Sequence, residues 1–301
     1  MFLWIILLIL VIFAATGIYF SLRILKPNVQ SAEKSFQKKI LTDRLINEFY
    51  QALAKQEVWI PSQYGYKLHG IYLPLEGSHK TVVITHGIET TLFASVKYVE
   101  LFRSLGFNVL LYDLRNHGSS GGKNTTFGYY EKYDLRTVVE WAFMRTGPGG
   151  LVGTMGESLG GAISIQHAAI DSRVAFCIAA SSFSDFRQLL IYRFKYEFKL
   201  PVFPFLQLAN FMTAMLSGMS FDAVSPLRDI GEISLPVLLI HGANDRYVPA
   251  QMSKDLYEAK KKGIRSIYLS QNAGHADSFT VNREEYTQQV RSFLGKIGML
   301  E

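Results

Sequence analysis

Short apolar runs alternate with amphipathic stretches between residues 57 and 297, and this alternation restricts the chain to few folds. Each run is rich in Val, Ile or Leu, which is typical of a strand buried inside a parallel sheet. Helical patterns separate the runs, so we predict an α/β fold: a mostly parallel central sheet with helices on both faces. An antiparallel hairpin is predicted at its start, in "EVWIPSQYGYKLHGIYLP". The clearest buried runs are "KTVVITHG", "FNVLLYDLRNHG", "GLVGTMGES", "VAFCIAAS" and "PVLLIHGAND".

One stretch, about residues 183–222, breaks this alternation. It is rich in Phe and has no strand pattern, so we predict helices inserted over the strand ends as a lid. Its apolar composition favours a lining for an apolar pocket or a contact with a membrane, and ordinary helical packing is the alternative. The chain has 301 residues, of which 49% are hydrophobic, and this is enough for one large core. We assign residues 57–301 to this domain.

Residues 1–22 contain no charged side chain. As a helix they would measure roughly 33 Å, close to the hydrocarbon thickness of a bilayer. A secretory signal peptide is the alternative, with a weak cleavage site at residues 14–17. A signal peptide normally carries basic residues before its apolar stretch, and here none precedes it. We therefore predict an uncleaved, single-pass transmembrane anchor over residues 1–22.

Basic residues follow the anchor, beginning with Arg23 and Lys26. By the positive-inside rule, this places the globular part in the cytoplasm. Residues 23–56 are then a linker, and residues 31–55 are predicted to form an amphipathic helix that joins anchor to domain or lies on the membrane. The net charge of +6 could also indicate nucleic-acid binding. No nucleic-acid motif is present, and the basic cluster beside the apolar stretch favours a membrane surface.

The chemistry is suggested by "GTMGESLGG" at residues 153–161, which contains the pattern G-x-S-x-G around Ser158. The pattern alone is weak, since it also occurs by chance. Here it lies between a predicted strand and a predicted helix, where a sharp turn needs small neighbours such as Gly156 and Gly160. Such a turn is a nucleophile elbow, which raises a serine hydroxyl above the sheet at a helix N-terminus. We therefore predict that Ser158 is a nucleophile.

A serine nucleophile needs a base, and the base needs a carboxylate. His275 is the only histidine after the last predicted strand, and Asp245 follows the strand before it. The chain order Ser158, Asp245, His275 is the order of nucleophile, acid and base that this arrangement uses. Other histidines are expected to shape loops or to be structural. The competing acids are Asp113, which is expected to order a loop, Asp222 and Asp277.

At these residues the chain resembles the α/β-hydrolase superfamily. Within it, the chain is similar to the serine aminopeptidase and monoglyceride lipase group and to membrane-anchored bacterial hydrolases. The resemblance covers about residues 57–297 and implies that the backbone N–H groups of Leu159 and Ile88 form an oxyanion hole. A related loop often reads H-G-x-G, whereas this chain has Glu89 at the last position, so we expect Glu89 to point away or the loop to be reshaped. The matching stretches are "THG" (85–87), "DLRNHGSS" (113–120), "GESLGG" (156–161), "GANDRYVP" (242–249) and "AGH" (273–275).

The predicted activity is therefore that of a serine hydrolase. Ser158 would attack an acyl carbonyl, His275 would carry the proton, and water would release the acid from an acyl-enzyme. No cofactor or metal is predicted. The lid and the anchor favour lipid-like acyl esters as small-molecule substrates. Peptidase activity, acyl transfer to another acceptor, and a non-catalytic membrane-anchored binding module are the alternatives, and the sequence predicts no oligomeric state.

Overall fold

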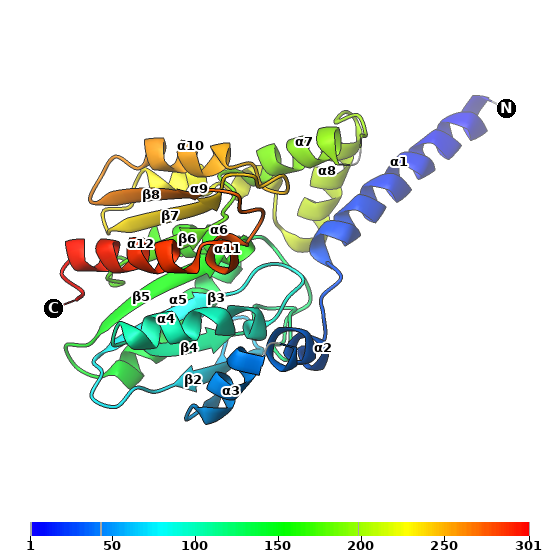
Figure 1. Cartoon of the computed structure of the whole chain (residues 1–301). Coiled ribbons are helices and arrows are strands. Elements are labelled where there is room, and N and C mark those ends of the chain that lie inside the picture. The colour runs from blue at the N-terminus through cyan, green and yellow to red at the C-terminus, as the bar shows by residue number, and fades with distance from the viewer. Residues whose placement is uncertain (1, 43, 198, 301) are drawn as a thin grey trace.

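The computed structural model describes residues 2–42, 44–197 and 199–300. Its centre is a sheet of eight strands in the order β1-β2-β4-β3-β5-β6-β7-β8 (Figure 1). The pairs β1–β2 and β2–β4 are antiparallel, and all other neighbours are parallel. The predicted hairpin and mostly parallel sheet are thereby confirmed. The strands are β1 (Gln56–Pro61), β2 (Lys67–Leu73), β3 (Lys80–Thr85), β4 (Asn108–Tyr112), β5 (Leu151–Glu157), β6 (Cys177–Ala180), β7 (Val237–Gly242) and β8 (Arg265–Ser270).

The central strands are buried on both faces, as their apolar runs require. Side chains along a strand point alternately to the two faces. In β3, Val82 and Ile84 therefore pack into one core, while Val83 packs into the other. In Figure 1, α4 and α12 lie over the face of Val82 and Ile84. The main helices around the sheet are α4 (Val99–Ser104), α5 (Glu131–Thr146), α6 (Leu159–Ala168), α10 (Gln251–Ala259), α11 (Ser278–Val281) and α12 (Arg283–Lys296).

The strand order brings the predicted site residues to one edge. β3 pairs with β4 on one side and with β5 on the other, so the chain reverses direction across the sheet at β3. Ligands of open α/β sheets bind beside such a reversal, at the carboxyl ends of the strands. The loops that follow β3, β5, β7 and β8 carry Ile88, Ser158, Asp245 and His275, respectively.

A helical insertion lies between β6 and β7, as predicted for the lid. It contains α7, α8, a short 3₁₀ helix η3 and α9, the last of which follows residue 222 (Figure 1). Asp185 caps α7 by accepting a hydrogen bond from the N–H of Gln188, and Gly218 ends α8 in a left-handed conformation. The bounds are α7 (Phe186–Tyr196), α8 (Phe205–Ser217), η3 (Phe221–Ala223) and α9 (Pro226–Ile230).

The N-terminal segment begins with one long helix, α1 (Phe2–Leu25), which is long and apolar enough to cross a membrane. The helix continues beyond residue 22, the predicted end of the anchor, to Leu25. The side chain of Leu25 is buried in the core of the domain. The amphipathic helix expected at residues 31–55 is instead broken into α2 (Ala32–Phe36), a π-helical turn η1 (Gln37–Leu41) and α3 (Arg44–Ala52). Phe36 packs on Phe93 of the 3₁₀ helix η2 (Leu92–Tyr98), so this segment lies against the domain.

Candidate active site

Ser158 occupies the turn between β5 and α6. Its backbone has φ 57° and ψ −118°, a strained conformation for a residue with a side chain. The turn closes because its flanking glycines lack side chains. A Cβ on Gly156 would lie 2.0 Å from the carbonyl oxygen of Gly160, and a Cβ on Gly160 would lie 2.0 Å from that of Thr85. The G-x-S-x-G pattern is thus a steric requirement of a sharp turn with the geometry of a nucleophile elbow.

The structure brings Ser158, His275 and Asp245 into one hydrogen-bonded chain. Ser158 Oγ lies 2.8 Å from Nε2 of His275, and Nδ1 of His275 lies 2.7 Å from Oδ2 of Asp245. An ionised carboxylate can only accept hydrogen bonds, so Nδ1 carries the hydrogen. Nε2 is then free to accept the hydrogen of the Ser158 hydroxyl. This tautomer is the one in which an imidazole can take a proton from serine.

Asp245 is buried and held as a carboxylate. Burial disfavours its charge, but hydrogen bonds from His241 and His275 outweigh burial and hold the pKa of the Asp245 carboxyl below its usual range. Its Oδ1 accepts hydrogen bonds of 2.9 Å from the N–H groups of Tyr247 and Val248. Oδ2 lies 3.1 Å from Nε2 of His241, a contact that the sequence analysis did not predict. The signal was present in the sequence, because His241, near the end of β7, comes only four residues before Asp245.

Two of the three competing carboxylates, Asp113 and Asp222, have other partners. Asp113 lies, as expected, within a loop, where it accepts hydrogen bonds from the N–H groups of Leu92 (2.8 Å) and Ser119 (3.0 Å). Asp222 forms an ion pair with Arg187 in the lid. The carboxylate that His275 contacts is that of Asp245.

Leu159 follows Ser158 in the chain, and Ile88 lies in a loop that approaches Ser158 closely. Leu159 is the first residue of α6, where backbone N–H groups have no intrahelical partner. Ile88 follows Gly87, and a Cβ on Gly87 would lie 3.4 Å from the Cβ of Ser158. Both residues line the same pocket as Ser158. Their role as oxyanion donors stays a prediction.

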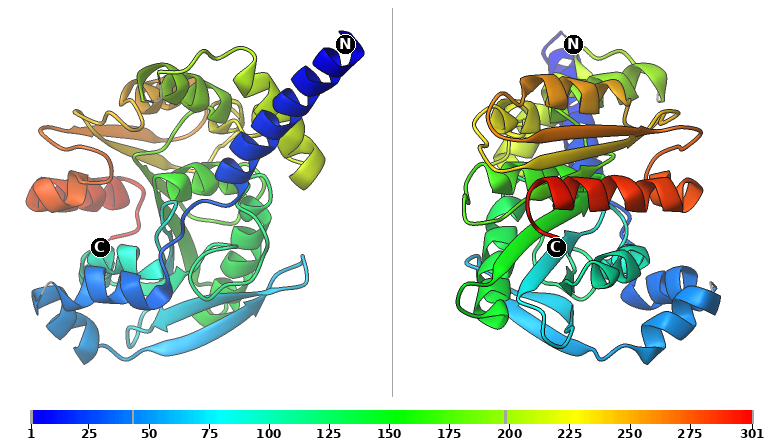
Figure 2. Two further views of the ribbon diagram at one scale, coloured as in Figure 1. Left: turned by 90° about the vertical axis from the view of Figure 1, so that its right-hand side faces the viewer. Right: turned by 60° about the vertical axis from the view of Figure 1, so that its left-hand side comes forward.

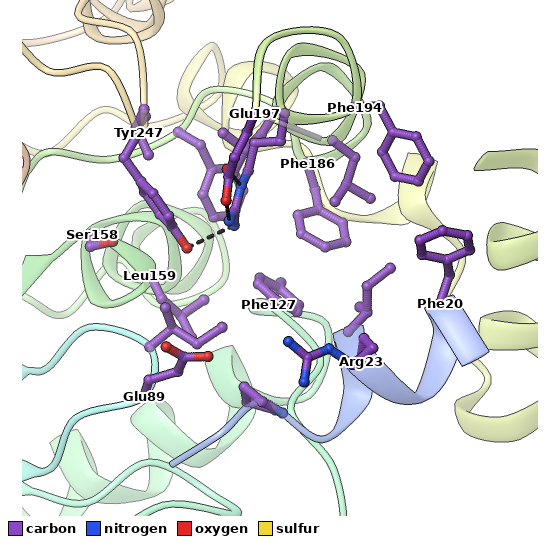
Figure 3. Close-up of a pocket in the computed structure, with 18 residues that line it drawn as sticks. Phe20, Arg23, Glu89, Phe127, Ser158, Leu159, Phe186, Phe194, Glu197 and Tyr247 are labelled. Carbon is purple, nitrogen blue, oxygen red and sulfur yellow. Dashed lines mark hydrogen bonds and ion pairs between the residues drawn. The ribbon is translucent and has the colours of Figure 1, made fainter. Parts of the chain in front are cut away.

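Glu89 lines the same pocket as Ser158, at an exposed position (Figure 3), and its orientation relative to the oxyanion hole stays a prediction. Its φ of 61° is a conformation that favours glycine, which explains why a related loop carries glycine there. Two hydrogen bonds of the Glu89 backbone hold the loop in place. The N–H of Glu89 donates to Nε2 of His117 (3.3 Å), and its carbonyl accepts from the N–H of Gln30 (3.1 Å).

A pocket of about 390 Å³ opens beside Ser158. Apolar side chains of the lid form much of its wall, as the Phe-rich composition predicted. The C-terminal end of α1 forms another part of the wall, which the sequence analysis did not predict (Figure 3). Arg193 donates a 2.7 Å hydrogen bond to the hydroxyl of Tyr247, whose ring lies 4.8 Å from that of His275. The apolar wall includes Phe20, Ile24, Phe127, Phe183, Phe186, Leu189, Leu190 and Phe194.

Comparison with known proteins places this architecture in a family. Residues 80–206 match the sequence profile of the α/β hydrolase fold. The uncharacterised protein YqkD of Bacillus subtilis (strain 168) is 38% identical over 282 residues, covering 93% of this chain and 92% of YqkD. This chain belongs to the α/β hydrolase family.

Two further relatives of this α/β hydrolase have named activities. The esterase Pf2001 of Pyrococcus furiosus has a similar structure, with a TM-score of 0.68 and 26% identity, covering 82% of this chain and 94% of the esterase. The lysophosphatidylserine lipase ABHD12 of Danio rerio is 25% identical over 239 residues, covering 73% of this chain and 59% of the lipase. The chain is therefore a hydrolase of α/β fold with esterase-like structural neighbours.

The loop that carries His275 is linked to the loop of Ser158 by a partly buried ion pair of this α/β hydrolase. The Glu157 side chain is paired with Lys97 at 2.7 Å and also accepts a hydrogen bond from Tyr98. Lys97 donates a second hydrogen bond, of 3.1 Å, to the carbonyl of Ala276. Glu157 precedes Ser158 and Ala276 follows His275, so one lysine ties the two loops together. The sequence analysis missed this lysine, which lies in no motif.

The stability of the α/β hydrolase is expected to depend on pH through His86. Burial, together with the nearby His117, lowers the pKa of His86 to about 4, whereas an unfolded histidine titrates near 6.5. The unfolded chain therefore binds more protons between these values, and the free energy of unfolding rises with pH. The neutral ring fits its role, since Nε2 accepts a hydrogen bond from the N–H of Leu114 (3.0 Å).

We expect the contribution of His86 to be complete above about pH 6.5 and to be lost progressively down to about pH 4, a change of about 3 kcal/mol. The measurement is urea unfolding of the full chain in detergent at pH 4 to 7. The free energy of unfolding of His86→Gln should vary less with pH than that of the wild type, whereas exposed His79→Gln should vary as the wild type does. An unchanged pH dependence in His86→Gln would contradict the assignment.

Proposed function

We propose that this α/β hydrolase is a serine hydrolase that cleaves carboxylic esters, with Ser158 as nucleophile, His275 as base and Asp245 as its carboxylate. The observation that carries the proposal is the hydrogen-bonded chain of 2.8 Å and 2.7 Å through the two nitrogens of His275. It supports the proposal because it joins a strained serine at a helix N-terminus to a base whose tautomer is fixed.

The proposed reaction has two halves. Ser158 Oγ bonds to the acyl carbon as His275 takes the hydroxyl proton, and the N–H groups of Leu159 and Ile88 stabilise the oxyanion. The ester bond breaks, and the alcohol leaves with the proton from His275. Water then attacks the acyl-enzyme, giving its proton to His275, and the acid leaves as Ser158 recovers the proton.

Lipid-like acyl esters are the proposed substrates. The pocket beside Ser158 is largely apolar, and such a wall favours an acyl chain over a peptide. The named activity of the similar protein ABHD12, a lysophosphatidylserine lipase, agrees with this choice. An aminopeptidase-like activity would need an acidic group for the substrate amine. Glu89 at the rim is one such group, so amide hydrolysis is the second candidate.

We further propose that residues 1–22 anchor the protein in a membrane, with residues 23–56 as the linker and the domain of residues 57–301, including its lid at about 183–222, in the cytoplasm. The first half of α1 supports the anchor. Large apolar side chains such as Phe2, Trp4 and Val11 are exposed on it, whereas the core helix of a soluble protein would bury them.

Labelling with a fluorophosphonate probe tests the function. We expect the full chain in detergent to be labelled at Ser158 and Ser158→Ala to remain unlabelled, because only an activated serine reacts. Hydrolysis of p-nitrophenyl esters of increasing length should then favour long chains. A probe that labels neither protein would favour a non-catalytic binding module, and faster cleavage of peptide amides than of esters would favour the second candidate.

A further inference from the structure

The C-terminal half of α1 is part of the folded body rather than a free tether. Gly17 approaches α8 so closely that a Cβ on it would lie 2.9 Å from Cγ of Met212. One turn later, the buried hydroxyl of Thr213 donates a 3.0 Å hydrogen bond to Ser21 Oγ. Figures 1 and 2 show α8 beside this half of α1. The lid helix α8 therefore lies at the same level along α1 as Gly17 and Ser21.

The length of α1 determines where this contact must lie if the helix crosses a membrane. The charge-free residues 2–22 measure about 31 Å as a helix, which matches the hydrocarbon thickness of about 30 Å. Residues 2–16, which precede Gly17, would measure only about 22 Å. A spanning α1 therefore carries its contact with α8 several ångströms into the hydrocarbon.

The surface of α8 suits that position. Residues Phe205–Ser217 include no charged side chain. Phe211 and Met215 are 62% and 69% exposed and lie one turn apart on the same face, with Leu216 beside them. Large apolar side chains gathered on an exposed helix face are unfavourable in water and favourable within a bilayer.

The pocket is next to this surface. Phe20 of α1 lines the pocket, and its ring lies 5.4 Å from that of Phe194 in α7 and 6.0 Å from that of Phe205 in α8. Arg23 lies at the exposed rim and is the first charged residue after the apolar stretch (Figure 3). A basic residue in this place marks the headgroup level of a membrane.

We propose that α8 inserts beside α1 into one leaflet of a lipid bilayer, so that the pocket opens toward the lipid and an ester carried by the membrane reaches Ser158 from the leaflet. This inference rests on the proposed anchor and deepens the proposed function by assigning the site to membrane-borne esters. The apolar region of the leaflet is the occupant because α8, which packs beside α1, exposes large apolar side chains as α1 does.

A depth measurement tests the insertion. The full chain is placed in vesicles of phosphatidylcholine and phosphatidylglycerol, with a nitroxide attached through Phe211→Cys or Met215→Cys. We expect both labels to be more accessible to oxygen than to a water-soluble nickel chelate. A label at Met144→Cys, which is 67% exposed on α5, should show the reverse. The unmodified chain is the labelling control, since its single cysteine, Cys177, is buried.

Two results would overturn the insertion. Nickel access at residues 211 and 215 equal to that at residue 144 would place α8 in water. Spin–spin broadening that disappears on dilution with unlabelled protein would mean that a second copy of the chain covers this face. The measurement needs no enzymatic activity, so its failure is distinguishable from failure of the proposed hydrolase.

A kinetic comparison tests the route of the substrate. Met215→Lys is expected to lower hydrolysis of long-chain esters embedded in vesicles by about tenfold, because a charge in hydrocarbon opposes insertion. Hydrolysis of soluble p-nitrophenyl acetate should be unchanged, since Met215 does not line the pocket. Met144→Lys, the matched control, should change neither rate. An equal loss on both substrates would overturn entry from the leaflet.

Discussion

Ser158→Ala is expected to lower kcat/KM for ester hydrolysis by about 10⁴-fold or more, and His275→Ala by a similar factor. The reason is the 2.8 Å contact between Ser158 Oγ and Nε2 of His275, through which the hydroxyl proton must pass. Because the two side chains act in one proton transfer, the double variant should be no slower than either single variant.

The measurement is the rate of p-nitrophenyl butyrate hydrolysis by the wild type and the three variants in the same detergent, with thermal unfolding as a check of the fold. Ser164→Ala is the matched control. Ser164 lies in α6, the helix that follows Ser158, is buried, and its hydroxyl has no hydrogen-bond partner within the described part of the chain. It should retain full activity. If Ser158→Ala kept more than about a tenth of the activity, Ser158 would not be the nucleophile.

The arrangement of Ser158, Asp245 and His275 could be predicted because each follows a strand of its own. A short apolar run signals a buried strand locally, and the carboxyl ends of parallel strands meet at one edge of the sheet whatever the details of packing. The assembly of these residues is observed in the structure, while their catalytic role stays a prediction. The chain order also favoured Asp245 over Asp113 as the carboxylate, because Asp113 precedes the nucleophile and Asp245 follows it.

The place of α1 could not be predicted in the same way. A charge-free helix signals a membrane span by composition, but composition does not indicate which helix packs against it. The traces in the sequence are small residues such as Gly17 and Ser21, which lie one turn apart and permit close approach.

Gly160→Ala is expected to lower the free energy of unfolding by about 3 kcal/mol or more and to abolish ester hydrolysis. The added Cβ would lie 2.0 Å from the carbonyl oxygen of Thr85 and 2.7 Å from that of His86, both of them backbone atoms at the end of β3. A backbone carbonyl cannot rotate away as a flexible side chain can, so α6 must move away from the sheet.

The same movement of α6 explains why Gly160→Ala should affect ester hydrolysis more severely than the free energy of unfolding. The close approach at Gly160 brings Leu159, at the start of α6, to the loop that carries Gly87 and Ile88, and both predicted oxyanion donors depend on it. Chemical unfolding and ester hydrolysis are measured beside Gly295→Ala, a control in α12 whose added Cβ meets nothing within 4 Å. That control should be neutral or stabilising by up to about 1 kcal/mol. If Gly160→Ala had the same free energy of unfolding and the same rate of ester hydrolysis as Gly295→Ala, the close packing of α6 on β3 would not be what holds Ser158 in place.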